Sequence, residues 1–295
     1  MVATLERELS GAESIEIDKS LDVDVVDRID AKSFRREYIG RNRPLKMTGM
    51  MDSWPAMKRW SFPFFHGLNS DSKIHLEVGN VMQEDTRFRQ EAFKDFIEDL
   101  IEDDGTVDRP KAYLSVFRLF DYFPHLRDDV DFSILDDHKV KASSSGWIGP
   151  AGTVTGYHID WGDNILAQIH GRKRLHLAAP ADTPNMYVSN KFDQGTTISE
   201  VDLNDVDHER FPRFRHVRHA EIILNPGEMI FIPRGWWHHV QSLDKSISVS
   251  NITFDWFGIF RDVIPHRIKQ AVHNAGLWKC PCTCHVVSDG KWVKK

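Results

Sequence analysis

The pattern that most restricts the fold is the series of short apolar segments between Tyr113 and Phe254. Gly, Pro and Asp residues separate these segments, and several of them, such as 247–254, alternate apolar with polar residues. Alternation with a period of two places successive side chains on opposite faces of a sheet. Many short strands joined by turns are typical of a sandwich or barrel. The sequence therefore predicts a mainly β core with flanking helices.

A few further elements are expected around this core. Helices are predicted for residues 31–40, 91–104 and 259–275, where apolar residues recur at helical spacing. Residues 44–48 and 74–78 are predicted strands. A chain of 295 residues with 41% apolar residues can bury a full core as one large domain.

The expected domain organisation has four parts. Residues 1–20 are polar and acidic and are predicted to be a flexible lead-in. One large domain is expected over residues 21–257, followed by a C-terminal helix at 258–277 and a cysteine-containing tail at 278–295. Within the domain, the polar residues 181–220 are interpreted as an insertion between core strands, a common place for a substrate-facing loop.

Composition restricts the compartment and the partners. The net charge is −6 and no basic block is present, which argues against broad binding to nucleic acid. No apolar run is long enough to span a membrane, and no secretory signal precedes the domain. The three cysteines lie too close together for a disulfide framework. We therefore expect a soluble cytoplasmic protein.

Two histidine-containing stretches carry the chemistry. His158 and Asp160 are two residues apart, so on a strand both side chains leave from the same face. His238 and His239, in a later stretch, each offer a third ligand, and strand alternation sends them to opposite faces. Two histidines and one carboxylate leave coordination positions open, as non-haem Fe(II) oxygenases require. Among 15 histidines such a triplet also arises by chance, so the neighbouring motifs have to support it.

Lys173 begins a predicted strand after the turn at Gly171. A lysine at this place can point into the interior as a fixed cation. On the local pattern alone, an exposed surface lysine is favoured, because lysine is seldom fully buried.

Several separated motifs in this order resemble a known family. They are Phe34–Pro44, Ser53–Ala56, Tyr113-Leu-Ser, Ile148–Pro150, Thr155-x-x-His158-x-Asp160, Gly171-Arg-Lys173 and Ile232-Pro-x-x-Trp-Trp-His-His239. Together they resemble the cupin-type, JmjC-domain 2-oxoglutarate-dependent oxygenases, in particular the asparaginyl-hydroxylase-like branch that includes the factor inhibiting HIF. The resemblance covers residues 21–257 and implies a double-stranded β-helix, or jelly-roll, core.

The resemblance also implies the cofactors and the site. His158, Asp160 and His238 would bind Fe(II), with the first histidine of the pair as the third ligand. Lys173 would bind the distal carboxylate of 2-oxoglutarate, with hydroxyl groups from Tyr113 and Thr155, since a buried charge needs partners.

Asn164 and Asn251 would flank the iron near the proximal carboxylate of 2-oxoglutarate. With O₂, such a site hydroxylates a substrate and releases succinate and CO₂. Trp236 and Trp237 are expected to pack in the wall of the site rather than to take part in the chemistry.

The substrate stays open at this stage. Gly156 stands where the family often has proline, and Trp161-Gly162 stands where polar residues are usual, so the rim of the pocket differs. The leading prediction is a dioxygenase that hydroxylates a protein or peptide side chain. The alternatives are the same chemistry on a small molecule or a free amino acid, N-methyl demethylation, and a non-catalytic cupin-like binding module.

Two expectations concern the C-terminus. In the resembling branch, C-terminal helices pair two subunits, so a homodimer through this helix is predicted. Cys280, Cys282, Cys284 and His285 are ligand types that zinc prefers. Their spacing, at nearly every second position of one segment, disfavours a closed site, and a tail with free thiols or a partial site completed by another subunit are the alternatives.

Overall fold

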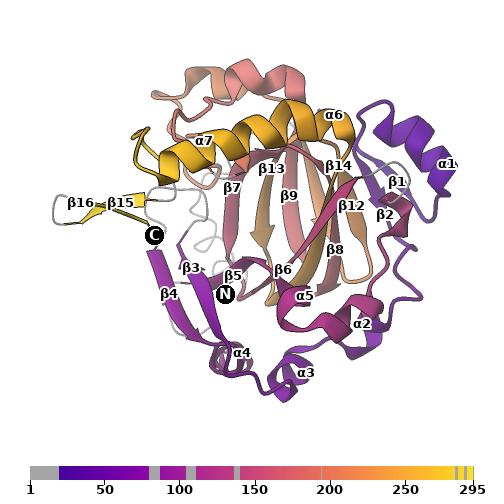
Figure 1. The fold of residues 1–295 in the computed structure, drawn as a ribbon. Coiled ribbons are helices and arrows are strands. Elements are labelled where there is room, and N and C mark those ends of the chain that lie inside the picture. The colour runs from indigo at the N-terminus through magenta and orange to yellow at the C-terminus, as the bar shows by residue number, and fades with distance from the viewer. Residues whose placement is uncertain are drawn as a thin grey trace, which may run out of the picture.

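Two sheets form the core of the protein (Figure 1). The computed structural model describes residues 20–79, 87–103, 111–135, 140–193, 195–282, 285–288 and 291–294. The larger sheet has the strand order β1-β2-β12-β8-β14-β6-β5-β3-β4, and the smaller has the order β10-β7-β13-β9-β11. A separate hairpin, β15-β16, lies near the C-terminus.

The strands are short, as the sequence predicts. Those of the larger sheet are β1 Asp24–Val26, β2 Leu45–Met47, β3 Lys73–Val78, β4 Arg87–Ala92, β5 Ala112–Phe117, β6 Lys141–Gly149, β8 Asp163–His170, β12 Met229–Ile232 and β14 Ser246–Phe254. Those of the smaller sheet are β7 Val154–Asp160, β9 Lys173–Ala178, β10 Thr196–Ile198, β11 His219–Leu224 and β13 Trp237–Ser242. The hairpin consists of β15 His285–Ser288 and β16 Lys291–Lys294.

The winding of the chain identifies the architecture. From β6 to β9, and again from β11 to β14, consecutive strands alternate between the larger and the smaller sheet. This alternation of antiparallel strands is the winding of a jelly roll. The expected double-stranded β-helix core is therefore confirmed.

Helices surround this core. They are α1 Ala31–Phe34, the π-helix η1 Arg35–Ile39, α2 Pro55–Arg59, α3 Phe62–Gly67, α4 Phe93–Glu102, α5 Leu119–Tyr122, the 3-10 helices η2 Pro124–Asp129, η3 Ser133–Leu135, η4 Pro180–Asn185 and η5 Pro212–His216, then α6 Trp256–Gly258, the π-helix η6 Ile259–Val263 and α7 Ile264–Asn274. Among the described residues, no helix is both long and apolar enough to cross a membrane.

Three hydrophobic clusters hold the layers together. The outer face of the larger sheet packs against the N-terminal helices, with Phe34 edge-on to Phe231. A second cluster joins the outer face of the smaller sheet to the predicted insertion, where Tyr157 packs against Phe214. The third cluster fills the space between the sheets and includes Leu175 and Leu177. Each sheet is thus covered on its outer face. Between the sheets, the apolar cluster leaves one end of the barrel for polar side chains.

Most predicted elements are present with shifted ends. Asp30 caps the first helix by accepting a hydrogen bond from the Ser33 backbone nitrogen at 2.9 Å. The helix expected over 91–104 begins only at Phe93, because residues up to Ala92 continue β4, and residue 104 lies outside the described residues. The strand at 45–47 is not the first, because β1 precedes it and pairs with it in parallel.

The C-terminal helix begins earlier than predicted, at Trp256 rather than at residue 259. We call residues 256–274, which form α6, η6 and α7, the C-terminal arm. The arm runs across the ends of several strands (Figure 1) and is followed by Gly276 at a φ of 71°, which favours glycine. The predicted lead-in at residues 1–19 and Cys284 lie outside the described residues.

Candidate active site

Strand pairing brings the three predicted iron ligands together. His158 and Asp160 leave β7 on one face, and His238 on β13 lies directly opposite His158 in the antiparallel pair. His158 Nε2 lies 3.9 Å from Asp160 Oδ1, and His238 Nε2 lies 3.5 Å from Asp160 Oδ2. All three side chains are buried and offer ligand atoms within 4.8 Å of one another. This is the only cluster of three or more such ligands in the part of the chain that the structure describes.

Backbone carbonyl groups fix the orientation of both imidazole rings. His158 Nδ1 donates to the Gly156 carbonyl at 2.8 Å, and His238 Nδ1 donates to the Trp236 carbonyl at 3.1 Å. A proton on Nδ1 leaves the lone pair on Nε2, the atom that faces Asp160. Burial, together with the neighbouring His158, lowers the pKa of His238 to about 4. His238 is therefore neutral at physiological pH and ready to bind a cation.

These residues fit a divalent metal with open coordination positions. Two imidazoles and one carboxylate on one side of a common point are the facial set of non-haem Fe(II) oxygenases. Asn164 supports the carboxylate, because its Nδ2 donates to Asp160 Oδ2 at 2.8 Å. The other amide atom, Asn164 Oδ1, is buried without a hydrogen-bond partner. An unpaired buried acceptor beside the triad indicates that a further polar group belongs there.

A bulge in β7 turns Thr155 into the interior. Between the pairs His158–His238 and Thr155–Val240, β7 advances by three residues and β13 by two. Strict alternation would put Thr155 on the face opposite to His158, whereas one extra residue in a strand reverses the phase. Thr155 therefore reaches the Tyr113 phenol, with which it makes a hydrogen bond. Gly156, where the family often has proline, lies in the bulge and supplies the carbonyl that orients His158.

Lys173 is buried inside the barrel, as the resemblance implies and the local pattern does not. It begins β9 on the inward face that it shares with Leu175 and is 1% exposed. Its Nζ donates to the Tyr113 hydroxyl at 3.1 Å. Burial lowers the pKa of Lys173 to about 7, and burial together with the charge of Glu77 raises the pKa of Tyr113. An ammonium group and two hydroxyl groups thus converge in a closed pocket suited to a carboxylate.

Asn251 lies elsewhere than the resemblance implies. On β14 it has the phase of Ile247 and Val249, which pack against the N-terminal helices on the outer face of the larger sheet. Its Oδ1 accepts a hydrogen bond from the Ser144 hydroxyl at 2.8 Å. It lines a polar cavity of about 430 Å³ that also includes Arg118. This placement gives no support to a direct contact with 2-oxoglutarate.

The two tryptophans of the later motif pack as expected. Trp236 belongs to the cluster between the sheets, and its Nε1 donates to the Asn42 carbonyl at 2.9 Å. Trp237 belongs to the cluster outside the smaller sheet, and its Nε1 donates to the Thr183 hydroxyl at 3.0 Å. Both side chains therefore hold the walls that carry His238.

The cysteine-rich segment is only partly described. Cys280 Sγ lies 3.7 Å from His273 Nδ1, and that nitrogen also donates to the Trp278 carbonyl at 2.9 Å. A protonated Nδ1 has no lone pair for a metal. Because Cys284 and the side chain of His285 lie outside the described residues, the metal question at this segment stays a prediction.

Sequence reasoning missed two residues that face the same interior. Glu77 lies opposite Tyr113 in the β3–β5 pair and accepts a hydrogen bond from the Ser115 hydroxyl at 2.6 Å. Trp147 on β6 lies with its ring centroid 6.0 Å from that of Tyr113. The signal for Glu77 was its alternation with Ile74 and Leu76, whose buried side chains take the other face of β3.

Comparisons with known proteins agree with this geometry. A family model described as "Cupin-like domain" matches residues 31–257. The chain is 33% identical to lysine-specific demethylase 8 of Xenopus tropicalis, over 74% of this chain and 49% of that protein. It is 30% identical to JmjC domain-containing protein D of Dictyostelium discoideum, over 73% of this chain and 52% of that protein. It is 28% identical to human HSPB1-associated protein 1, over 78% and 50% of the two chains.

The chain spans about half the length of these curated relatives, so the agreement concerns the domain and its site. The match covers most of the domain from the first helix to the end of β14, and the ligand set His158, Asp160 and His238 lies within it. The chain belongs to the cupin-like domain family, among the JmjC oxygenases that use Fe(II), 2-oxoglutarate and O₂.

Proposed function

We propose that the protein is an Fe(II)- and 2-oxoglutarate-dependent dioxygenase that hydroxylates a side chain of a protein or peptide. One observation carries the proposal. The ligand triad and a buried ammonium group lie on the inward faces of neighbouring strands β7, β13 and β9. A buried lysine without an anionic partner is costly, so Lys173 argues for a ligand that brings a carboxylate.

Each residue of the site has a separate task in this proposal. His158, Asp160 and His238 would hold the iron, and Lys173, Tyr113 and Thr155 would hold the distal carboxylate of 2-oxoglutarate. When bound, the iron couples oxidative decarboxylation of 2-oxoglutarate to oxygen insertion into the substrate, with release of succinate and CO₂. Asn164 keeps the Asp160 carboxylate in place through its amide. These residues bind and orient the reactants, and the buried site limits side reactions.

A basic side chain is the substrate class that the interior favours. The Glu77 carboxylate is near enough to Tyr113 for its charge to raise the pKa of that phenol, and Tyr113 in turn accepts a hydrogen bond from Lys173. The Trp147 ring also lies near Tyr113, with the two ring centroids 6.0 Å apart. A carboxylate beside an aromatic ring suits a cationic group. One of the compared proteins, lysine-specific demethylase 8, carries a name that describes lysine demethylation, which also concerns a basic side chain.

Demethylation is the second candidate because it needs the same chemistry. Hydroxylation of an N-methyl group gives an unstable carbinolamine, which releases formaldehyde and the demethylated amine. The name of lysine-specific demethylase 8 favours this outcome, whereas an unmethylated side chain would keep its hydroxyl group.

A homodimer through the C-terminal arm is also part of the proposal. One side of the arm exposes large apolar residues at helical spacing: Trp256, Phe257, Phe260, Ile264 and Ile268. A second copy of the arm offers the same apolar stripe, and a two-fold axis would bury both. Light scattering at micromolar concentration should give twice the 34.1 kDa chain mass. A monomer that persists at that concentration would contradict the dimer.

The enzyme assay tests the central proposal. Iron-loaded protein is incubated with 2-oxoglutarate and 15-residue peptides that contain one central arginine, lysine, dimethyl-lysine or asparagine. Succinate and formaldehyde are measured, and mass spectrometry follows a gain of one oxygen or the loss of a methyl group. Asp160→Ala is the reference, since it removes one ligand from an otherwise intact barrel. Equal succinate production by wild type and Asp160→Ala would refute the dioxygenase assignment.

A further inference from the structure

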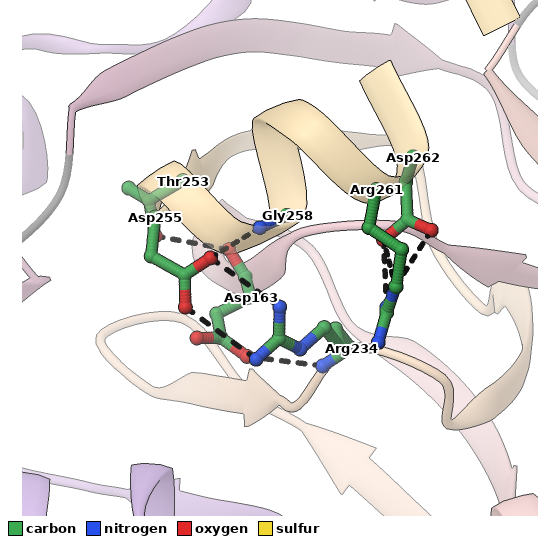
Figure 2. A network of polar contacts seen from close by, with 7 residues as sticks. All are labelled: Asp163, Arg234, Thr253, Asp255, Gly258, Arg261 and Asp262. Carbon is green, nitrogen blue, oxygen red and sulfur yellow. Dashed lines mark hydrogen bonds and ion pairs between the residues drawn. The ribbon is translucent and has the colours of Figure 1, made fainter. Parts of the chain in front are cut away.

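Polar contacts join the start of the C-terminal arm to the loop before the third iron ligand (Figure 2). Asp255 caps α6 by accepting a hydrogen bond from the Gly258 backbone nitrogen at 2.6 Å. The same carboxylate faces the Arg234 guanidinium, with Nη1 at 3.4 Å from Oδ1 and Nη2 at 3.5 Å from Oδ2. A Cβ atom at Gly258 would lie 3.3 Å from Arg234 Nη1, so a small residue permits this close approach. The start of the arm therefore contacts the barrel at Arg234.

Arg234 is also tied to both ligand-bearing segments. It stands in the turn between β12 and β13, four residues before His238. Its backbone nitrogen donates to Asp163 Oδ1 at 3.1 Å, and the next nitrogen, of Gly235, donates to the Asp160 carbonyl at 3.2 Å. A displacement of Arg234 would therefore shift the strand ends that carry Asp160 and His238.

A second contact places the middle of the arm over the same end of the barrel. Trp161, which directly follows Asp160, lies edge-on to the His266 ring of α7 with centroids 4.3 Å apart. Phe192, from the insertion, also stacks on His266, with ring centroids 4.9 Å apart and an interplanar angle of 15°. The arm is thus held beside the iron ligands by one ion pair and one aromatic stack. The arm therefore borders the end of the barrel at which β7 ends with Asp160.

We propose that Arg234 and Asp255 are positioning residues that hold the C-terminal arm as one wall of the substrate entrance. This inference rests on the proposed function, because it names what controls substrate access to that site. The arm then serves two purposes, with its apolar stripe facing outward and the contacts of Gly258 and His266 facing the barrel.

The geometry of the ion pair favours positioning over stability. Its N···O distances of 3.4 and 3.5 Å exceed those of a tight charge-assisted hydrogen bond, and about a third of each side chain is exposed. Such a pair contributes little to the free energy of unfolding. By contrast, Arg261 and Asp262 make a tight contact of 2.6 Å within the arm itself (Figure 2). Asp255 acts on Arg261 more weakly than Asp262 does, and among the described residues neither Arg261 nor Asp262 makes a hydrogen bond or ion pair to the loops that carry the ligands.

The test compares Asp255→Asn with Asp262→Asn. Asparagine caps a helix as well as aspartate does, so Asp255→Asn keeps the start of α6 and removes only the charge. Asp262→Asn removes the same charge from the same arm and is the matched control. Hydrogen–deuterium exchange over residues 256–274 measures the docking of the arm. Two KM values are measured in parallel. One is for 2-oxoglutarate, and the other is for whichever of the arginine, lysine, dimethyl-lysine and asparagine peptides the wild type turns over.

For Asp255→Asn we expect faster exchange in the arm and a KM for the peptide raised about fivefold. The KM for 2-oxoglutarate should change less than twofold, because Lys173 lies away from the arm inside the barrel. Asp262→Asn should match the wild type in all three measurements. Equal behaviour of the two variants, or an equal rise in both KM values for Asp255→Asn, would overturn the inference.

Substitutions of Arg234 provide an independent test if Asp255→Asn does not fold. Arg234→Lys keeps a cation and should restore most of the peptide affinity that Arg234→Gln loses. Identical KM values for these two variants would again refute a role for the charge. If the wild type turns over none of the peptides, the proposed function fails, and the exchange experiment still decides whether the ion pair docks the arm.

Discussion

The two faces of the smaller sheet carry similar residues in very different surroundings. On the inward face, His158 and His238 each have one nitrogen bound to a carbonyl and the other directed at Asp160. On the outward face, His239 is buried with neither ring nitrogen hydrogen-bonded. The insertion covers that face with apolar side chains. The presence of buried histidines is therefore not sufficient for a metal site. The imidazole rings must also be held by hydrogen bonds and lie around a shared carboxylate.

The neighbours of His239 sharpen the contrast. Tyr157, His239, His176 and Glu221 form a row across four strands of the outward face. Tyr157 hydrogen-bonds His219 at 2.8 Å, and His176 contacts Glu221 at 3.0 Å. Burial and the nearby His176 lower the pKa of His239 to about 3, so it is neutral. We expect substitutions on the inward face to impair iron or 2-oxoglutarate binding and those on the outward face to affect stability alone.

The largest expected effect comes from exchanging the two adjacent histidines separately. His238→Ala removes a ligand and should abolish iron-dependent succinate formation while the protein stays folded. His239→Ala removes a ring of nearly the same burial from the other face and should retain turnover. Iron content and succinate are measured for both proteins. Loss of iron in His239→Ala with retention in His238→Ala would reverse the ligand assignment.

The next effect concerns Lys173. Lys173→Ala removes the cation of the anion pocket and should raise the KM for 2-oxoglutarate by more than tenfold, since losing a buried charged partner costs about 2–5 kcal/mol. Iron binding should persist, because the triad is untouched. Arg174→Ala, at the next position and on the other face of β9, is the matched control. A normal KM in Lys173→Ala would show that this lysine has no part in binding.

How much the sequence could predict depended on whether local alternation held. The triad followed from a two-residue spacing on β7 and a strand pairing, both of which survive in the fold. Thr155 could not be placed by alternation, because the bulge at Gly156 reverses its phase, and only the family motif pointed inward. Asn251 shows the converse, and its contact with 2-oxoglutarate stays a prediction. The motif matched, yet its phase on β14 places it outside the barrel.

Residues contributed by distant segments were beyond the reach of local pattern. Glu77 meets Tyr113 only because β3 pairs with β5. Arg234 meets Asp255 only because the chain after β14 turns back over the barrel end. The local sequence pattern favoured an exposed position for Lys173. In the fold its side chain is buried, because it begins β9 on the inward face directly after a turn. Burial is a property of the assembled sheets, and no short window of sequence contains it.

A smaller effect is expected on the pH dependence of co-substrate binding. In the free protein the pKa of Lys173 is lowered to about 7, so above that pH the amine is increasingly neutral. A bound carboxylate favours the charged form and raises this pKa, so binding above pH 7 takes up a proton. The Kd for 2-oxoglutarate should therefore rise with pH above 7, by up to about tenfold per unit. Calorimetry in two buffers of different ionisation enthalpy measures the proton uptake. A Kd independent of pH between 6.5 and 9 would contradict the lowered pKa.

The smallest effect is expected at His239 itself when its shape is kept. A buried polar group without partners gains nothing from its polarity, and replacing it with an apolar group of similar size is nearly neutral or stabilising. His239→Leu should therefore unfold at a denaturant midpoint equal to or above that of the wild type. Tyr157→Phe, in contrast, takes a hydroxyl group from His219 and should cost about 1 kcal/mol of unfolding free energy. Urea titrations of both variants test the difference. If His239→Leu loses more unfolding free energy than Tyr157→Phe, then His239 has a hydrogen-bond partner on the outward face. The two faces would then differ in metal binding but not in whether their histidines are hydrogen-bonded.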